Sequence, residues 1–246
     1  MNCQLPNFFT HKPSKNLIRL GCNNDGGYLI SQDDIYRTDI LVTMGLYDDW
    51  SFEKDFLNKH FIDLISYDGS VSRLIFFSRF FFNAIKLKFK KSKRWLIALK
   101  KYSFFKSNKK HIKKHIGTKK NQISIDEIFS NLTSYQNIFF KIDIESSEYE
   151  ILDTLIKHQY QISGMAIEFH DCAKNINAIE NFIRDFELNL VHVHANNNSS
   201  IDENMLIPNA LELTFSRYGN LSNTQYSYHP LDQRCNPNKP EYYIII

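Results

Sequence analysis

The stretch NIFFKIDIESSEYEIL, residues 137–152, combines a strand of buried type with the beginning of a helix. Its apolar run predicts a strand that ends at Asp143 and Glu145. The following SSEYEILDTLIKH, residues 146–158, predicts a helix with an acidic residue in its first turn and basic residues in its last, as the helix dipole favours. A strand followed directly by a helix is one half of a βαβ unit, so we expect these carboxylates at the end of a parallel strand.

The same alternation of strands and helices extends toward the N-terminus. LIRLGCNNDGGYLI, residues 17–30, predicts a hairpin whose turn contains two Asn, one Asp and two Gly. The apolar run Ile40 to Met44 predicts the first parallel strand, which ends at Gly45, and a helix is expected to begin with Ser51 near its N-cap. FIDLISYDGS, residues 61–70, predicts a second parallel strand that ends in Tyr67-Asp68.

Alternation also continues toward the C-terminus. A third strand and loop are expected at 115–124, and Ser124 with Glu127 forms a capping box for a helix that ends near Asn131. Further strands are expected at 163–171, 188–197 and 210–218, with a helix at 177–186. The apolar end of the tail 229–246 either adds an edge strand or covers the core. This pattern predicts a doubly wound α/β domain with a seven-stranded sheet over residues 1–246.

Composition favours a packed intracellular enzyme. The hydrophobic content of 43% excludes a disordered chain, and 246 residues suffice for one α/β domain. The four cysteines are scattered without a CxxC pair, so we expect them reduced. The N-terminus lacks the pattern of a signal peptide, and a cytoplasmic protein is the simplest interpretation.

Positive charge is concentrated in one segment. Residues 71–120 contain 17 of the 30 Lys and Arg residues and no Asp or Glu, whereas the rest of the chain carries 13 basic and 27 acidic residues. Within it, 71–115 mixes aromatic and basic residues at helical spacing without Gly or Pro, and predicts an insertion of about two amphipathic helices. Three roles remain open for it: a solvated cap over the substrate, a surface that attracts a phosphate-bearing substrate, or a patch for nucleic acid or membrane.

Polar residues end nearly every expected strand. In a doubly wound sheet the ligand lies outside the carboxyl ends of the strands. A glycine after the first strand and a carboxylate after the second suit an adenosine cofactor, because the carboxylate accepts the ribose hydroxyls. The first loop has a single Gly and so matches poorly the fingerprint that cradles a pyrophosphate. S-adenosylmethionine has no phosphate, which favours a methyltransferase. The residues concerned are Gly45, Asp68, Asp143, Glu145, Glu168, His170, Asp171, His194, Asn196 and Asn197.

Six segments of the chain resemble the FkbM-like family of S-adenosylmethionine-dependent methyltransferases. They are RLGCNNDGGYLI, VTMGLYDDWSFE, ISYDGS, KIDIESSEYEIL, AIEFH with HVHANN, and DQRCNPNKP. The family usually has Gly where Ser146 stands, a departure that matters only if the turn needs a positive φ. The resemblance implies a class I methyltransferase fold and methylation of carbohydrate or secondary-metabolite hydroxyls. It implies that Gly45 and its loop face the methionine part of the cofactor, that Asp68 faces the ribose, and that Asp143 lies near the reacting methyl group. The expected cofactor-binding residues are Gly45, Asp49, Ser51, Tyr67, Asp68, Asp25, Gly26, Gly27 and Tyr28.

Methyl transfer to a hydroxyl requires that its proton be removed while the oxygen is held in line with the methyl group. Beside Asp143, His170 and His194 are the candidate bases, because neutral imidazole is available near pH 7. Alternatively Asp143, Glu168, His170 and His194 could hold Mn²⁺ or Mg²⁺, which would lower the pKa of the hydroxyl. His192 is expected on the opposite strand face from His194, in a structural role.

Three functions compete at this point. The first is an O-methyltransferase acting on a sugar hydroxyl, in a nucleotide-sugar or in a surface glycan such as capsule or lipopolysaccharide, with no nucleic-acid partner and a cytoplasmic location that extends to the inner membrane face. The second is a nucleic-acid methyltransferase that uses 71–120 for phosphate contacts. The third is a degenerate fold kept as an assembly partner of other glycan enzymes. The oligomeric state is left open.

Overall fold

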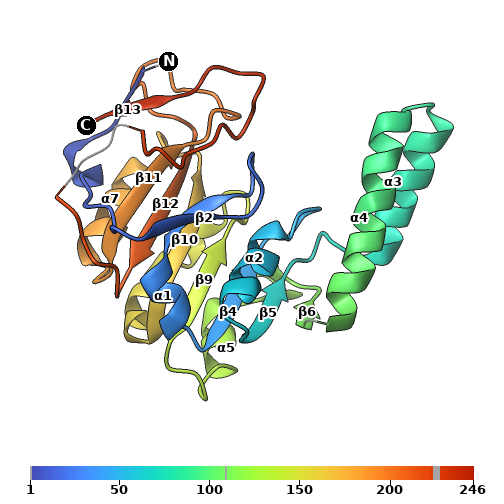
Figure 1. The fold of residues 1–246 in the computed structure, drawn as a ribbon, viewed down its shortest axis with the longest axis horizontal. Coiled ribbons are helices and arrows are strands. Elements are labelled where there is room, and N and C mark those ends of the chain that lie inside the picture. Colours follow the sequence, from blue (N-terminus) through green and yellow to red (C-terminus); the bar gives the residue numbers. More distant parts are fainter. Residues whose placement is uncertain (1, 109, 224–227) are drawn as a thin grey trace.

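The computed structural model describes residues 2–108, 110–223 and 228–246. Its central sheet has seven strands in the order β11-β12-β10-β9-β4-β5-β6 (Figure 1). All neighbours pair in parallel except β12, which is antiparallel to both β10 and β11. This order, with one antiparallel strand next to an edge, is that of the class I methyltransferase sheet, so the expected α/β fold is confirmed. The strands are β4 Ile40–Met44, β5 Asp63–Tyr67, β6 Lys110–Ile112, β9 Ile138–Ile142, β10 Ile162–His170, β11 Asn189–Ala195 and β12 Ala210–Ser216.

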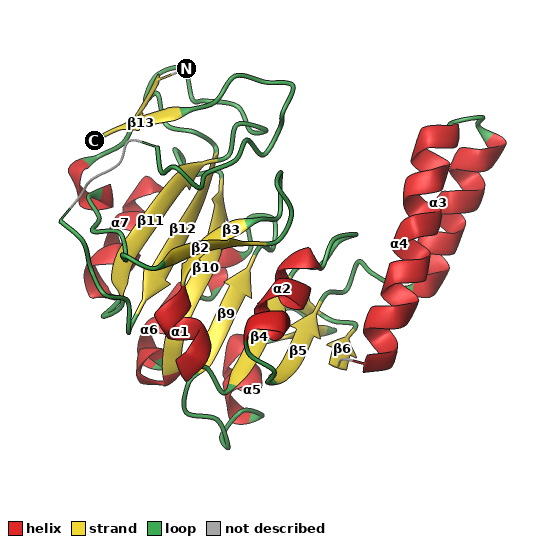
Figure 2. Ribbon diagram, viewed as in Figure 1, coloured by secondary structure: helices red, strands yellow, loops and turns green. Residues whose placement is uncertain are grey.

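Both faces of the sheet are buried, as parallel strands require. Ile40, Val42 and Met44 of β4 belong to one core, whereas the intervening Leu41 belongs to the other. The first core is closed by α5 Ile125–Ser130, α6 Leu152–Lys157 and α7 Ile176–Asp185, and the second by α1 Gln32–Arg37, α2 Ser51–Lys59 and the expected hairpin β2 Leu17–Leu20 with β3 Tyr28–Ser31 (Figure 2). The doubly wound layering is therefore observed.

The basic segment forms two antiparallel helices, which we call the arm: α3 Arg73–Ile85 and α4 Phe89–Asn108. The arm stands apart from the rest of the molecule beyond β6 (Figure 1). Ser72 caps α3 by accepting a hydrogen bond from the Ile75 N–H, and α4 returns the chain to β6. Two helices in this segment were predicted and are confirmed. Within the described residues, no helix is long and apolar enough to cross a membrane.

Aromatic packing holds the base of the arm to the domain. The rings of Phe76 and Trp95 stack at 5.9 Å between centroids, and Tyr102 meets Phe76 edge-on at 5.4 Å. Trp50, directly before α2, completes the group at 5.9 Å from Tyr102. Since Trp50 follows the loop that leaves β4, the arm is attached beside the carboxyl ends of the strands.

Three local predictions were wrong. The third parallel strand is Lys110–Ile112 and not part of 115–124, where β7 His115–Ile116 and β8 Gln122–Ile123 form a separate two-stranded pair. The single helix over 146–158 is a 3₁₀ turn, η2 Glu148–Glu150, followed by α6. The start of α2 is confirmed: the helix begins at Ser51, next to its N-cap Trp50, and Asp49 accepts the hydrogen bond from the N–H of Ser51. The capping of α5 by Ser124 is confirmed. The apolar end of the tail forms β13 Tyr243–Ile245, which pairs with β1 Asn2–Gln4 away from the central sheet.

The third error concerns β11. The rings of His192 and His194 lie 6.3 Å apart and nearly parallel, on the same strand face. Residues two apart in a strand point to the same side, so the expectation of opposite faces was mistaken.

Candidate active site

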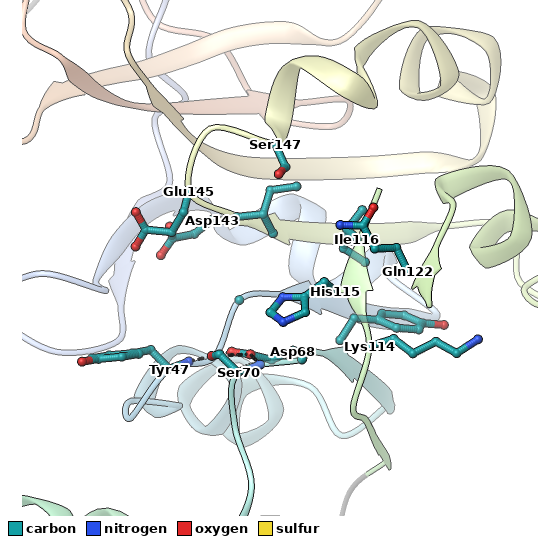
Figure 3. A pocket seen from close by; sticks show the side chains of 14 residues that line it. Tyr47, Asp68, Ser70, Lys114, His115, Ile116, Gln122, Asp143, Glu145 and Ser147 are labelled. Atoms are coloured by element: carbon teal, nitrogen blue, oxygen red, sulfur yellow. Dashed lines mark hydrogen bonds between the residues drawn. The ribbon is translucent and has the colours of Figure 1, made fainter. Parts of the chain in front are cut away.

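The ends of the three central parallel strands line one cavity of about 230 Å³ (Figure 3). Gly45 follows β4, Asp68 follows β5, and Asp143 with Glu145 follows β9. This is the crevice that the fold offers to a ligand. Figure 3 shows the carboxylates of Asp143 and Glu145 on the opposite side of the cavity from Tyr47, Asp68 and Ser70.

Asp68 is a fixed, buried anion in this cavity. Its Oδ2 accepts hydrogen bonds from the N–H groups of Leu46 and Tyr47 at 2.8 and 2.9 Å, and its Oδ1 accepts from the N–H and hydroxyl of Ser70, both at 2.6 Å. Burial alone would raise the pKa of Asp68, but the hydrogen bonds from Ser70, Leu46 and Tyr47 outweigh it and lower the pKa. A carboxylate held ionised here suits a ribose, whose hydroxyls are donors.

Gly45 allows a close approach between two strand ends. Its φ is +87°, and a Cβ at this position would lie 1.8 Å from the carbonyl oxygen of Asp143. Only glycine fits here. The sequence predicted glycine for contact with a ligand, whereas the structure shows that contact between β4 and β9 also requires it.

The fourth wall of the cavity comes from residues that the sequence did not indicate: Lys114, His115, Ile116 and Gln122, in and around the β7–β8 pair. A Cβ on Gly69 would lie 2.2 Å from the His115 ring, so the imidazole rests on the backbone of that glycine. His111 anchors the preceding strand, since its Nε2 lies 3.0 Å from the Asp68 carbonyl oxygen. The one feature of the sequence that could have indicated this wall is Gly69, which follows Asp68 and leaves room for the His115 ring.

A second group of polar side chains adjoins the cavity. Asp143, Glu168 and His170 offer ligand atoms that all lie within 4.8 Å of one another. His170 Nε2 lies 4.0 Å from Asp143, 3.9 Å from Glu168 and 3.8 Å from Glu145, while its Nδ1 hydrogen bonds to Glu148 at 3.0 Å. We call these five residues the acidic cluster. Asp143 belongs both to the cavity and to the cluster.

The cluster changes the protonation of its members. Burial would lower the pKa of His170, but the hydrogen bond to Glu148 and the charges of Glu168 and Asp143 raise it to about 9. Burial and the nearby carboxylate of Asp143 raise the pKa of Glu168 well above its usual value. His170 is therefore protonated near neutral pH in this arrangement, which differs from the neutral imidazole expected from the sequence.

His194 lies in a different group. Its Nδ1 is 2.9 Å from Glu212, and its ligand atom groups with those of Glu212 and Cys235 rather than with the acidic cluster. Burial opposes protonation, but the charge of Glu212 raises the pKa of His194 to about 10. Nearby, His192 pairs with Asp232 at 2.9 Å. The His194–Glu212 pair thus links β11 to β12, whereas Asp232 and Glu241, the latter 3.7 Å from His194 Nε2, attach the C-terminal tail to β11.

The expected cofactor residues divide among three places. Gly45, Tyr67 and Asp68 line the cavity. The turn that contains Asp25, Gly26, Gly27 and Tyr28 lies instead beside the acidic cluster, where the Tyr28 hydroxyl donates to Glu168 at 3.3 Å and the Asn196 amide donates to Glu168 at 2.8 Å. Asp49 and Ser51 line a further cavity.

This further cavity, which we call the groove, has a volume of about 530 Å³ and lies between the loop after β4 and the basic face of α4. Its cationic side chains are Lys90, Lys93, Arg94 and Lys101. Two acidic residues, Asp48 and Asp49, line the opposite wall, and Asp48 accepts two hydrogen bonds from Arg94. Such a lining attracts anionic groups.

Backbone strain surrounds the site. Four residues other than glycine have positive φ at the strand ends: Tyr47 at 46°, Glu145 at 54°, Ser146 at 76° and Asp171 at 51°. Each such conformation costs on the order of 1–2 kcal/mol for an L-residue. The turn at Ser146 therefore does need a positive φ, and a serine there has a physical cost that a glycine would avoid.

A divalent cation fits the donors of the acidic cluster. Carboxylate oxygens and one imidazole are the ligands that Mn²⁺ accepts, and Asp143, Glu168 and His170 converge from two adjacent strand ends. Against this, the buried Lys141 already places its ammonium 3.5 Å from Asp143 Oδ2. His194 lies outside this set.

Comparisons with known proteins yield no relative by sequence. No family model matches the chain, and no curated protein matches it. The resemblance to FkbM-like methyltransferases therefore stays a prediction.

Among solved structures, a fibrillarin pre-rRNA processing protein of Methanococcus jannaschii aligns with a TM-score of 0.35 and 11% identity, over 76% of this chain and 69% of that one. A fibrillarin in complex with Nop5p aligns with a TM-score of 0.32 and 10% identity, over 77% of this chain and 75% of that one. The strand order, rather than these distant likenesses, identifies the methyltransferase fold.

Proposed function

We propose that the protein transfers the methyl group of S-adenosylmethionine to a hydroxyl of a phosphate-bearing sugar, such as a nucleotide-sugar. The proposal rests mainly on the position of Asp143, which lines the cavity at the strand ends and also belongs to the acidic cluster. A methyl donor in the cavity and a hydroxyl at the cluster would meet at this residue.

The cavity supplies what the nucleoside part of the donor needs. Asp68 offers an ionised carboxylate to the ribose, and the apolar faces of Ile116 and Tyr67 border the same space. At about 230 Å³ the cavity is below the roughly 300 Å³ at which ligand pockets begin. We therefore expect the strained Tyr47 loop or the β7–β8 pair to move outward when the cofactor binds.

In the proposed transfer the methyl group would pass from sulfur to the hydroxyl oxygen, the electron pair of the methyl–sulfur bond would stay on sulfur, and the hydroxyl proton would go to the Asp143 carboxylate. The Asp143 carboxylate would accept the hydrogen bond of the hydroxyl and so orient its oxygen toward the methyl group. His170, which Glu148 holds in place, would fix Asp143 from the other side. A divalent ion held by Asp143, Glu168 and His170 would lower the pKa of the bound hydroxyl.

The groove supports the choice of a phosphate-bearing acceptor. Lys90, Lys93 and Lys101 follow one face of α4 and border the same loop that reaches the cavity at Tyr47. Nucleotide-sugars present a diphosphate, which such lysines bind as point charges.

Calorimetric titration with S-adenosylhomocysteine, with Mn²⁺, Mg²⁺ or EDTA, tests the cofactor site. Asp68→Asn should weaken binding by about tenfold or more, because a hydrogen bond to a charged acceptor is worth about 1.5–3 kcal/mol. The exposed Asp153 provides a matched control, and Asp153→Asn should leave affinity unchanged. An absence of binding in every condition would refute the methyltransferase proposal.

Methyl transfer to nucleotide-sugars, to free sugars and to RNA then tests the acceptor class. The proposal expects nucleotide-sugars to be methylated, and expects Lys93→Gln with Lys101→Gln to raise their KM with little change in kcat. Methylation of RNA alone, with steep salt dependence, would replace the proposed acceptor by a nucleic acid.

A further inference from the structure

The turn of the arm exposes an unusual amount of apolar surface. We call residues 81–91, FFNAIKLKFKK, the tip. Its apolar side chains are far from buried: Phe81 is 55% exposed, Phe82 58%, Ile85 67%, Leu87 72% and Phe89 70%. The inner faces of α3 and α4 are already covered by the packing of Phe76, Trp95 and Tyr102. Large exposed apolar side chains that gather in one turn are typical of an interaction site.

The same eleven residues carry four lysines and no acidic residue: Lys86, Lys88, Lys90 and Lys91, all exposed. Lysine and apolar residues alternate through the turn, where Leu87 adopts a positive φ of 54°. The ammonium of Lys86 lies 4.1 Å from the centre of the Phe82 ring, so charge and apolar surface are in direct contact.

We infer that the tip inserts into the surface of an anionic membrane, with its Phe and Leu side chains among the acyl chains and its lysines at the lipid phosphates. Charge complementarity selects this occupant. Basic residues next to large exposed apolar ones are the composition of segments that lie in the lipid interface, and anionic headgroups attract each lysine near the surface.

The position of the tip agrees with this role. In Figure 1 the arm extends past β6 in the direction in which the parallel strands point, so its tip lies toward the side of the molecule that holds the candidate active site. Contact at the tip would hold the groove and the cavity near the membrane. The inference does not depend on the proposed reaction.

Flotation with lipid vesicles tests it on the full chain. Vesicles of phosphatidylcholine alone and of phosphatidylcholine mixed with phosphatidylglycerol serve as probes, at low and high salt. We expect binding to the mixed vesicles that is weakened by salt, and little binding to the neutral ones.

Two variants separate the contributions. Lys86→Gln with Lys88→Gln and Lys91→Gln should weaken binding to the mixed vesicles by on the order of a hundredfold. Leu87→Asn with Phe89→Ser should weaken it by at least about tenfold, and the loss should persist at low salt. Asn tolerates the positive φ of position 87, so this variant should fold.

Matched controls lie on the body of the domain. Phe61 is 85% exposed, and Phe61→Ser removes a Phe outside the arm that is more exposed than Phe89. Lys54→Gln with Lys59→Gln removes exposed charge from α2. Both should bind vesicles as the parent does.

Other outcomes would overturn the inference. Equal binding of the parent and the tip variants would place any membrane contact elsewhere. Self-association or RNA binding that the tip variants abolish, without any binding to the mixed vesicles, would assign the tip to a second copy or to nucleic acid.

Discussion

At the scale of single residues, Asp68 is already fully engaged without a ligand. A carboxylate offers about four acceptor positions, and Leu46, Tyr47 and Ser70 occupy four. A ribose must therefore displace one of these donors, and the Ser70 hydroxyl is the one that can rotate away.

Because the Ser70 hydroxyl and the ribose compete for Asp68, removal of this hydroxyl should increase the affinity for the cofactor. Ser70→Ala removes the competing hydroxyl, so affinity for S-adenosylhomocysteine should rise by a few fold, the equivalent of about 0.5–1 kcal/mol. Calorimetric titration measures it. A weaker affinity would mean that the Ser70 hydroxyl contacts the cofactor itself.

Gly45 and Gly26 give a matched pair for backbone strain. Both have φ near +90°. A Cβ added at Gly45 would lie 1.8 Å from the carbonyl oxygen of Asp143, whereas a Cβ added at Gly26 would have its nearest neighbour, Asp49 Oδ2, at 3.7 Å. We expect Gly26→Ala to cost about 1–2 kcal/mol and Gly45→Ala more than about 3 kcal/mol, measured by urea denaturation. Equal losses would contradict the close contact of β4 with β9.

Residue roles were only partly predictable from the sequence. Strand ends placed Gly45, Asp68 and Asp143 correctly beside one another, because the carboxyl ends of parallel strands share an edge. The protonation of His170 depends on Glu148, which the sequence assigned to a helix turn, and His115 enters from a segment without a recognisable pattern. Such contacts arise only from tertiary packing.

At the scale of elements, the arm and the loop after β4 are coupled. Tyr47 packs edge-on against Trp95 at 5.9 Å, and Asp48 pairs with Arg94. Tyr47 also donates its backbone N–H to Asp68. The orientation of α4 therefore affects the geometry at the cofactor carboxylate.

Trp95→Ala tests this coupling, because Trp95 lines neither the cavity nor the groove. Loss of a buried Trp costs about 3–5 kcal/mol of local packing, so we expect weaker binding of S-adenosylhomocysteine and faster amide exchange in residues 46–50. Leu74→Ala on α3, 81% exposed, is the control and should change neither. Unchanged affinity in Trp95→Ala would show that the loop is independent of the arm.

Most elements were predictable because buried strands and amphipathic helices have distinct periods. The three-residue edge strand β6 was not, since a short edge strand in a Lys- and His-rich segment carries no period. Its position depends on pairing with β5.

At the scale of the whole molecule, buried charge pairs determine how stability depends on pH. The pKa of His194 is about 10 in the folded protein against 6.5 as its ordinary value. Its pairing with Glu212 therefore stabilises the fold fully below pH 6.5, and this contribution is lost as the pH rises through about 10.

Accordingly, the free energy of unfolding should fall between about pH 7 and 10, and the fall should be smaller in His194→Gln. Urea denaturation over this range measures it. Should the variant fail to fold, the NMR titration of His194 in the parent gives the same information, and an imidazole that titrates near 6.5 would disprove the pairing.

Fold class followed from the order of strands and helices along the chain, but the spatial order of the strands did not. β12 follows β11 in the chain but lies between β10 and β11 in the sheet. This position depends on antiparallel pairing with both neighbours, which no local sequence pattern specifies.

The route of the chain through the arm has a consequence for engineering. β5 and β6 are parallel neighbours, so a crossover must connect the carboxyl end of β5 to the amino end of β6. The helices α3 and α4 form that crossover. Parallel strands need a connection of about a dozen residues or more. The arm is thus an enlarged crossover and not a detachable appendage: it can be shortened to a single helix or exchanged for the crossover of another protein, but a direct splice from Val71 to Lys110 would remove a strand from the sheet.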